Sequence, residues 1–210
     1  MKRICLTSLA LAAALATGCN RTSKSSTDGT VGTAGRAASV SRADTDFVRD
    51  VTRANAAEID LGRLAAERST SPDVKEFANM LVTDHTAAGK KLGAITTEHA
   101  IEATTDNDDN LRDLRDKLSA KQGLDFERAY VDAMVDGHQK MIDKLESRLD
   151  RTSLVRTNDA DAAPPVVPEK SDDPVTSQIN AWAAESYPVV YGHLKTAKAL
   201  KDTLKKRSTN

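Results

Sequence analysis

Disulfide bonds are excluded from the folded part of this chain, because its only two cysteines, Cys5 and Cys19, both stand near the amino terminus. We interpret residues 1–18 as a signal peptide that carries Cys5 away, and Cys19 as a site of lipid attachment, which leaves no thiol pair in the mature protein. An exported domain of this size must then be stabilised by its hydrophobic core or by a metal ion.

Two other features that are scarce in the sequence limit the classes of function it can have. Aromatic residues form only 3% of the chain, and no basic stripe is interleaved with them. Removing Lys2 and Arg3 with the signal changes 30 basic and 31 acidic residues to 28 and 31, a net charge of −3. Both observations argue against nucleic-acid binding. The sequence has no Gly-rich phosphate loop and no Ser/His/Asp or Cys/His arrangement, so it favours a non-catalytic protein.

The amino terminus has the layout of an export signal. Residues 1–3 are Met-Lys-Arg, and residues 4–16 form an apolar run shorter than the about 20 residues that span a bilayer. The segment Ala-Thr-Gly-Cys at 16–19 resembles the bacterial lipobox, which implies cleavage before Cys19 and acyl chains on that cysteine, enough for lasting attachment to a membrane. By analogy with enteric bacteria, the non-acidic Asn20 predicts the outer membrane, with the protein facing the periplasm.

The rest of the chain divides into a tether and one helical domain. After Cys19, residues up to 43 are mostly Ser, Thr, Gly and Ala and predict a flexible tether. Residues 44–206 show helical periodicity, interrupted at 152–171 by an Asp-, Ala- and Pro-rich stretch that predicts a disordered insertion. Long amphipathic helices are predicted over about 44–68, 72–99, 125–151 and 172–205, with a short one around 111–118.

The positions of proline predict two helix starts and one kink within a helix. Ser71-Pro72-Asp73 and Asp172-Asp173-Pro174 have a capping side chain followed by proline in the first turn, the pattern of a helix start. Pro188 falls inside the last predicted helix and should kink it. Four long amphipathic helices with no plausible strand predict an all-α helical bundle.

Each long helix places one titratable side chain on its apolar face: Glu58, His85, His138 and His193. At 1.5 Å per residue, Glu58 lies about 15 Å and His85 about 20 Å from the same interhelical turn, so their depths match. We therefore predict a single polar layer through the middle of the bundle.

Such a layer is costly to bury unless its members bond to each other, to water or to a metal. Three neutral imidazoles and a carboxylate suit one transition-metal ion, Zn, Cu, Fe or Ni. The alternative is a metal-free network in which Glu58 accepts hydrogen bonds from the imidazoles and fixes the helix register. Met134 and Met141 flank His138 at helical spacing and could offer sulfur to copper or simply fill the core. The sequence leaves these alternatives open.

Short motifs occur in order along the predicted helices. They are EIDLGRLA at 58–65, SPDVKEFA at 71–78, Asp84-His85, Asp125-Phe126, His138-Gln139 and PVVYGHL at 188–194. In this order they resemble the bacterial domain of unknown function 4142 family, often labelled predicted outer-membrane protein. The resemblance implies a ferritin-like four-helix bundle, here with a short extra helix between the second and third long helices. The family has no settled activity to carry over.

One departure argues against a di-iron oxidase. Catalytic ferritin-like proteins hold two irons with Glu-x-x-His pairs, whereas the positions three before the core histidines are Val82, Val135 and Val190. Two functions remain. In the first, an envelope lipoprotein binds one transition-metal ion at its core layer, for metal handling or stress response. In the second, a metal-free lipoprotein with a buried Glu/His hydrogen-bond layer presents its helices to a protein or cell-wall partner.

Overall fold

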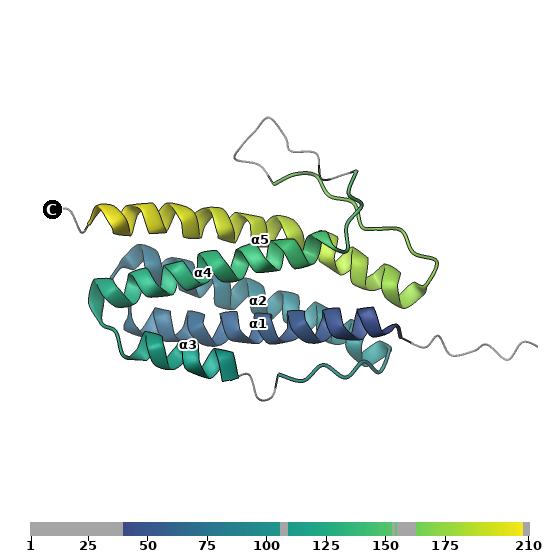
Figure 1. Cartoon of the computed structure of the whole chain (residues 1–210), viewed down its shortest axis with the longest axis horizontal. Helices are drawn as coiled ribbons and strands as arrows, with labels where there is room; N and C mark the ends of the chain where they lie inside the picture. Colours follow the sequence, from purple (N-terminus) through teal and green to yellow (C-terminus); the bar gives the residue numbers. More distant parts are fainter. Residues whose placement is uncertain (1–39, 106–108, 153, 155–162, 208–210) are drawn as a thin grey trace, which may run out of the picture. The chain divides into compact units, whose positions relative to one another are not determined.

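The computed structural model describes residues 40–105, 109–152, 154 and 163–207, and within them the chain forms five helices and no strand (Figure 1). The helices are α1 (Arg42–Arg68), α2 (Pro72–Glu98), α3 (Asp109–Ser119), α4 (Gly123–Glu146) and α5 (Pro174–Lys206). The all-helical class predicted from the sequence is confirmed. The expected signal peptide, Cys19 and the tether up to residue 39 lie outside the described residues.

Local capping explains where two of the long helices begin. α1 starts after Ser41, whose hydroxyl accepts a hydrogen bond from the Asp44 N–H at 3.0 Å. α5 starts after Asp173, whose carboxylate accepts from the Thr176 N–H at 2.9 Å, as the Asp-Pro pattern predicted. α2 begins at Pro72 as expected, but the side chain of Ser71 makes no capping hydrogen bond.

The start of α2 is held instead by Glu127 from α4. Its Oε1 accepts hydrogen bonds from the Ser69 hydroxyl at 2.7 Å, the Thr70 N–H at 2.8 Å and the Ser71 N–H at 2.7 Å. Glu127 is only 2% exposed, so these bonds form in the core. A carboxylate from another helix thus replaces the local cap, because the turn between α1 and α2 folds against α4.

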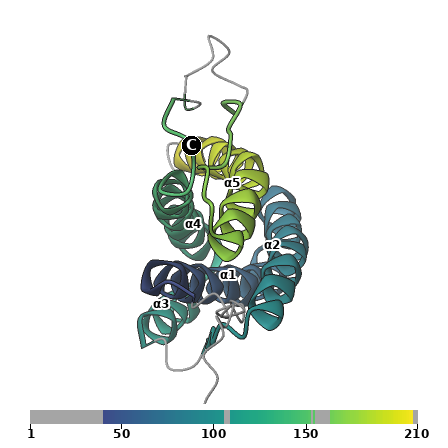
Figure 2. The ribbon, with the colours of Figure 1, turned by 90° about the vertical axis from the view of Figure 1, so that its right-hand side faces the viewer.

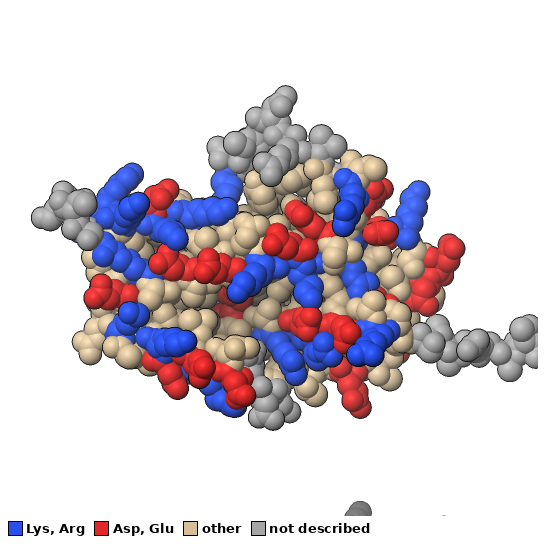
Figure 3. Space-filling model, in the orientation of Figure 1, with Lys and Arg blue, Asp and Glu red and all other residues tan. Residues whose placement is uncertain are grey.

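The four long helices enclose one core. α1 packs along α2, α4 along α5, α2 against α5 and α1 against α4, while α3 lies outside them beside α1 (Figures 1 and 2). Acidic and basic side chains are intermixed over most of the face seen in Figure 3. Among the described residues, no helix combines the length and the apolar character needed to cross a bilayer.

Buried apolar side chains form two clusters separated by a polar level. The first cluster includes Phe47 of α1, Leu145 of α4 and Trp182 of α5, and the second includes Leu61 of α1 and Leu81 of α2. On α1, α2 and α4, the residues Glu58, His85 and His138 lie in sequence between the buried residues of the two clusters. On α5, His193 lies next to Leu194, the last residue of the first cluster, and before Ala197 of the second. The polar level therefore crosses the core where the two apolar clusters meet.

The end of α4 differs from the predicted boundary. The helix ends at Glu146 instead of near 151, and Leu149, which is fully buried, forms an isolated antiparallel bridge with Pro168. The Asp150 N–H donates to the Val167 carbonyl at 2.9 Å. Backbone hydrogen bonds to a distant segment thus replace the last helical turn. Residues 153 and 155–162 of the expected insertion lie outside the described residues.

Pro188 lies inside α5, which remains helical from Pro174 to Lys206. Figure 1 shows this helix changing direction along its length, in agreement with the predicted kink.

Replacing Glu127 by alanine should lower the free energy of unfolding by about 2–4 kcal/mol, because buried donors of the 69–71 turn lose their acceptor. Denaturant unfolding of both proteins measures this difference. Glu76→Ala, at an exposed position of α2, is the control and should change stability by about 0.5 kcal/mol or less. Equal effects of the two substitutions would contradict the role assigned to Glu127.

Candidate metal centre

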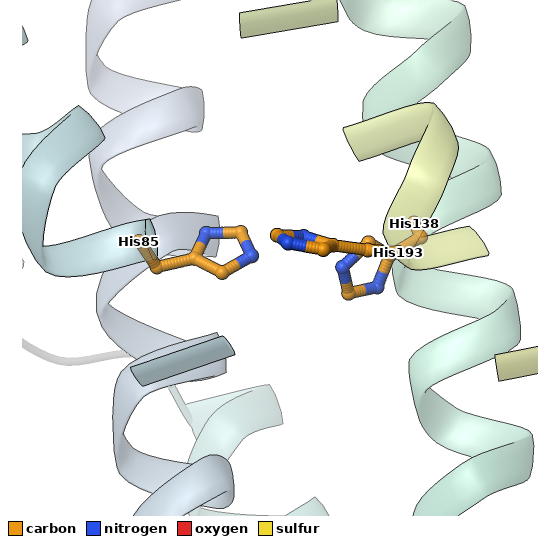
Figure 4. Close-up of side chains that lie close together, drawn as sticks. All are labelled: His85, His138 and His193. Atoms are coloured by element: carbon orange, nitrogen blue, oxygen red, sulfur yellow. The ribbon is translucent and has the colours of Figure 1, made fainter. Parts of the chain in front are cut away.

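Three of the four histidines meet in the core: His85 from α2, His138 from α4 and His193 from α5 (Figure 4). Their ring centroids are 5.6 Å apart for His85 and His138, 5.5 Å for His85 and His193, and 5.4 Å for His138 and His193. One ring nitrogen of each lies within 4.8 Å of the other two. The three side chains are buried, at 5%, 1% and 3% exposure. We refer to them below as the histidine triad; three buried imidazoles so placed could hold a metal ion.

The other nitrogen of each ring points away from the triad to an oxygen. These contacts are His85 Nδ1 to Asn55 Oδ1 at 3.0 Å, His138 Nδ1 to the Met134 carbonyl at 2.8 Å, and His193 Nε2 to Asp84 Oδ2 at 2.9 Å. A carbonyl and a carboxylate accept only, so these ring nitrogens carry the proton. The Asn55 amide also donates to the His85 carbonyl at 2.9 Å, which orients its oxygen toward the ring.

The remaining nitrogens therefore carry lone pairs. They are His85 Nε2, His138 Nε2 and His193 Nδ1, and all three are buried without a hydrogen-bond partner among the described residues. Outward N–H donation with an inward lone pair is the arrangement of metal-bound imidazoles, whose outer partners fix the tautomer. A shared cation would satisfy all three nitrogens together.

The charge state of the triad also suits a metal. Burial lowers the pKa of His85 to about 3, helped by the neighbouring rings of His138 and His193. Burial likewise lowers the pKa of His138 to about 4, and it lowers the pKa of His193 despite the opposing hydrogen bond to Asp84. All three imidazoles are thus neutral at pH 7, the form that ligates metals.

Glu58, the fourth residue of the predicted layer, lies beside the triad. Its Oε1 is 3.6 Å from His138 Nδ1, the nitrogen that donates to the Met134 carbonyl. The hydrogen bond from imidazole to Glu58 that a metal-free network requires is therefore not made by His138. Oε2 is buried and has no hydrogen-bond partner among the described residues. Burial raises the pKa of Glu58 to about 8, so the carboxyl is mostly protonated at pH 7.

Two helix glycines make room for the neighbours of the triad. An added Cβ would lie 2.7 Å from Asn55 Nδ2 at Gly89, and 2.7 Å from Glu58 Oε1 at Gly137. Glycine in a helix interior is about 1 kcal/mol less favourable than alanine. At these two positions the close approach of a neighbouring side chain therefore costs helix stability. Sequence reasoning gave no role to Asn55, Asp84 or these glycines. Glycine in the middle of two strong helical patterns was the available signal.

The remaining sequence candidates are His99, Met134 and Met141. His99 ends α2, where its Nε2 lies 3.1 Å from Gln178 Oε1 in a partly buried position. Met134 is buried in the second apolar cluster, and its carbonyl accepts the hydrogen bond from His138 Nδ1. Met141 is partly buried, packs against the first cluster and lines a pocket that His85 and His193 also line.

Alanine at Gly89 should stabilise the protein less than alanine at Gly93 on the same helix. At Gly93 an added Cβ meets nothing within 4 Å, so helix propensity alone should raise the free energy of unfolding by about 1 kcal/mol. Gly89→Ala should fall short of that gain by about 1–2 kcal/mol, because Asn55 must give up its bonds to His85. Denaturant unfolding of the two variants tests this, and equal gains would contradict it.

Glu58→Gln should remove a pH dependence of stability from the metal-free protein. A carboxyl whose pKa is raised from 4.5 to about 8 by burial stabilises the fold at low pH and loses that contribution as the pH rises through about 8. With chelator present, the free energy of unfolding of the native protein should fall by about 2–3 kcal/mol more than that of Glu58→Gln between pH 6 and pH 9. Parallel pH profiles for the two proteins would exclude a buried neutral Glu58; Glu76→Gln is the exposed control.

Comparison with known proteins gives one match. No curated protein and no solved structure matches the chain. A family model described as a domain of unknown function, DUF4142, matches residues 29–154, which is more than half of the 210 residues. The matched region contains Glu58, His85 and His138, and His193 follows it on α5. The chain therefore belongs to the DUF4142 family, as its motifs indicated.

Proposed function

We propose that this protein is a lipid-anchored protein of the bacterial envelope that binds one transition-metal ion in the core of a ferritin-like four-helix bundle and serves in metal handling. The observation that carries the proposal is the histidine triad, with three buried lone pairs on ring nitrogens that lie within 4.8 Å of one another. Zn, Cu, Fe and Ni all accept imidazole ligands of this kind.

The triad needs only a small adjustment to bind an ion. Metal–nitrogen bonds of about 2.0–2.1 Å bring ligand nitrogens to roughly 3.3–3.6 Å from one another. Closing from a separation of up to 4.8 Å requires ring movements on the order of 1 Å.

The unpaired ring nitrogens support metal binding over a metal-free layer. A buried polar atom left without a partner destabilises a fold by about 1–3 kcal/mol, and the triad contains three such atoms. An apolar side chain at these positions would avoid that penalty, so the histidines are best explained by a ligand that uses their lone pairs. In this arrangement the carboxyl of Glu58 lies beside His138. A Glu58→Gln variant tests whether that carboxyl also binds the ion.

The envelope location rests on the amino-terminal sequence. The segment 16–19 and the basic and apolar residues before it support cleavage and lipid attachment at Cys19, and Asn20 supports the outer membrane. The packing of α1, α2, α4 and α5 around one core supports the bundle. A protein held at the membrane in this way would meet metal ions that enter the periplasm.

Metal titration of the purified full chain tests the proposal. After chelator treatment, the chain should bind one Zn²⁺, Cu²⁺, Ni²⁺ or Fe²⁺ ion, measured by elemental analysis after dialysis and by calorimetry. The double variant His85→Ala/His138→Ala should lose at least about 100-fold in affinity, because two of three ligands are gone. His99→Ala removes the histidine outside the triad and should bind like the native protein.

Thermal unfolding gives a second readout. A saturating ion should raise the Tm of the native protein and of His99→Ala, but not of the double variant, because an ion that binds only the folded state stabilises it. Equal and negligible metal in the folded native protein and in the double variant would refute the metal site. Loss of affinity in Glu58→Gln as large as in the double variant would make Glu58 a fourth ligand.

A further inference from the structure

A pocket of about 150 Å³ between α2 and α5 leads from the surface to the triad. His85 and His193, both buried, line it together with Asn55 and Asp84, their hydrogen-bond partners. Most of its remaining wall is apolar and includes Trp182. Two of the three proposed ligands therefore border a space that their own helices leave open.

The outer end of this pocket is accessible. Lys91 of α2 and Glu185 of α5 form an ion pair across it, and their side chains are 57% and 60% exposed. Val189, also part of the lining, is 44% exposed. A small solute can therefore reach the pocket from solvent past a surface ion pair, which is weak and breaks readily.

Glu58 faces a different space. It lines a second pocket, of about 230 Å³ between α1 and α4, together with Gly137 and Lys140. None of the three histidines belongs to the lining of that pocket. Glu58 is thus absent from the lining of the α2–α5 pocket, to which His85 and His193 belong.

We propose that an ion held by the triad keeps one coordination position open toward the α2–α5 pocket and binds a small exogenous anion there through an oxygen or nitrogen atom. The inference rests on the proposed metal site. Three protein ligands with one free position are the arrangement by which zinc-type sites accept water or substrate. Three neutral imidazoles bring no negative charge to a divalent ion. Of the carboxylates that line the pocket, Asp84 is bonded to His193 and offsets part of the ion's charge, and Glu185 is paired with Lys91. The remaining positive charge attracts an anion, and apolar walls strengthen that attraction.

Pocket size limits the ligand to a few non-hydrogen atoms. A cavity of about 150 Å³ is comparable to those that hold one benzene molecule. Linear or compact anions such as azide, cyanide or formate fit this limit, whereas nucleotides and peptides do not. The ligand class is therefore a small monodentate anion.

Azide titration of the cobalt-loaded full chain tests the inference. Co²⁺ reports its coordination through its visible spectrum, and azide should change that spectrum with a single saturable transition at one azide per cobalt. Ser186→Phe, which fills the pocket from α5, should weaken azide binding at least about tenfold while one Co²⁺ per chain is retained. Ser177→Phe, at an exposed position of the same helix, should behave like the native protein.

Val189→Trp is a second variant that should block the pocket, at its exposed rim and without disturbing the core.

Stoichiometric Co²⁺ binding with no spectral response to azide would overturn the open position and leave the metal site intact. Absence of Co²⁺ binding to the folded chain would overturn the metal site and with it this inference. Unchanged azide affinity in both pocket variants would show that the anion does not enter between α2 and α5.

Discussion

The structure depends on how six ring nitrogens are satisfied in an apolar core. Three of them donate outward, to Asn55, to a backbone carbonyl of α4 and to Asp84, and these bonds fix the tautomer and direction of every ring. The other three carry lone pairs and are buried without a hydrogen-bond partner among the described residues. Helix propensity is sacrificed at Gly89 to make this geometry possible, because the Asn55 amide needs the space that a Cβ would fill.

Buried carboxylates elsewhere in the protein show what a purely structural solution looks like. Asp44 accepts hydrogen bonds from Ser41, Thr176 and Arg148, and it joins the starts of α1 and α5 to the end of α4. Burial alone would raise the pKa of Asp44, but these bonds outweigh it and lower the pKa. Glu127 is satisfied in the same way at the opposite end of the core. By contrast, each buried side chain of the triad and of Glu58 leaves one polar atom without a hydrogen-bond partner among the described residues, which separates this central level from those end contacts.

The position of the triad between two apolar clusters also defines its chemistry. Apolar packing on both sides keeps the imidazoles neutral, and neutral imidazoles are ready to bind a metal at ordinary pH. The α2–α5 pocket breaks this enclosure on one side, so an ion there would meet solvent through a narrow, mostly apolar passage. Valine three residues before each histidine removes the carboxylates that a two-iron site would need.

Sequence periodicity by itself determined the all-helical class, the extents of α1 and α2, and the burial of Glu58, His85, His138 and His193 on the core faces of the long helices. It did not indicate that Asp44 and Glu127 are also buried. It determined depth as well, because the rise per residue is constant along a helix. Tertiary structure alone decided which neighbours those residues contact. The rotation of α1 about its axis places Glu58 beside the donor nitrogen of His138. The packing of α2 against α5 brings Asp84 to His193. Backbone pairing with residues 167–169 ended α4 early, and Glu127 replaced the expected cap of α2. These contacts join residues far apart in the sequence, so no local pattern specifies them.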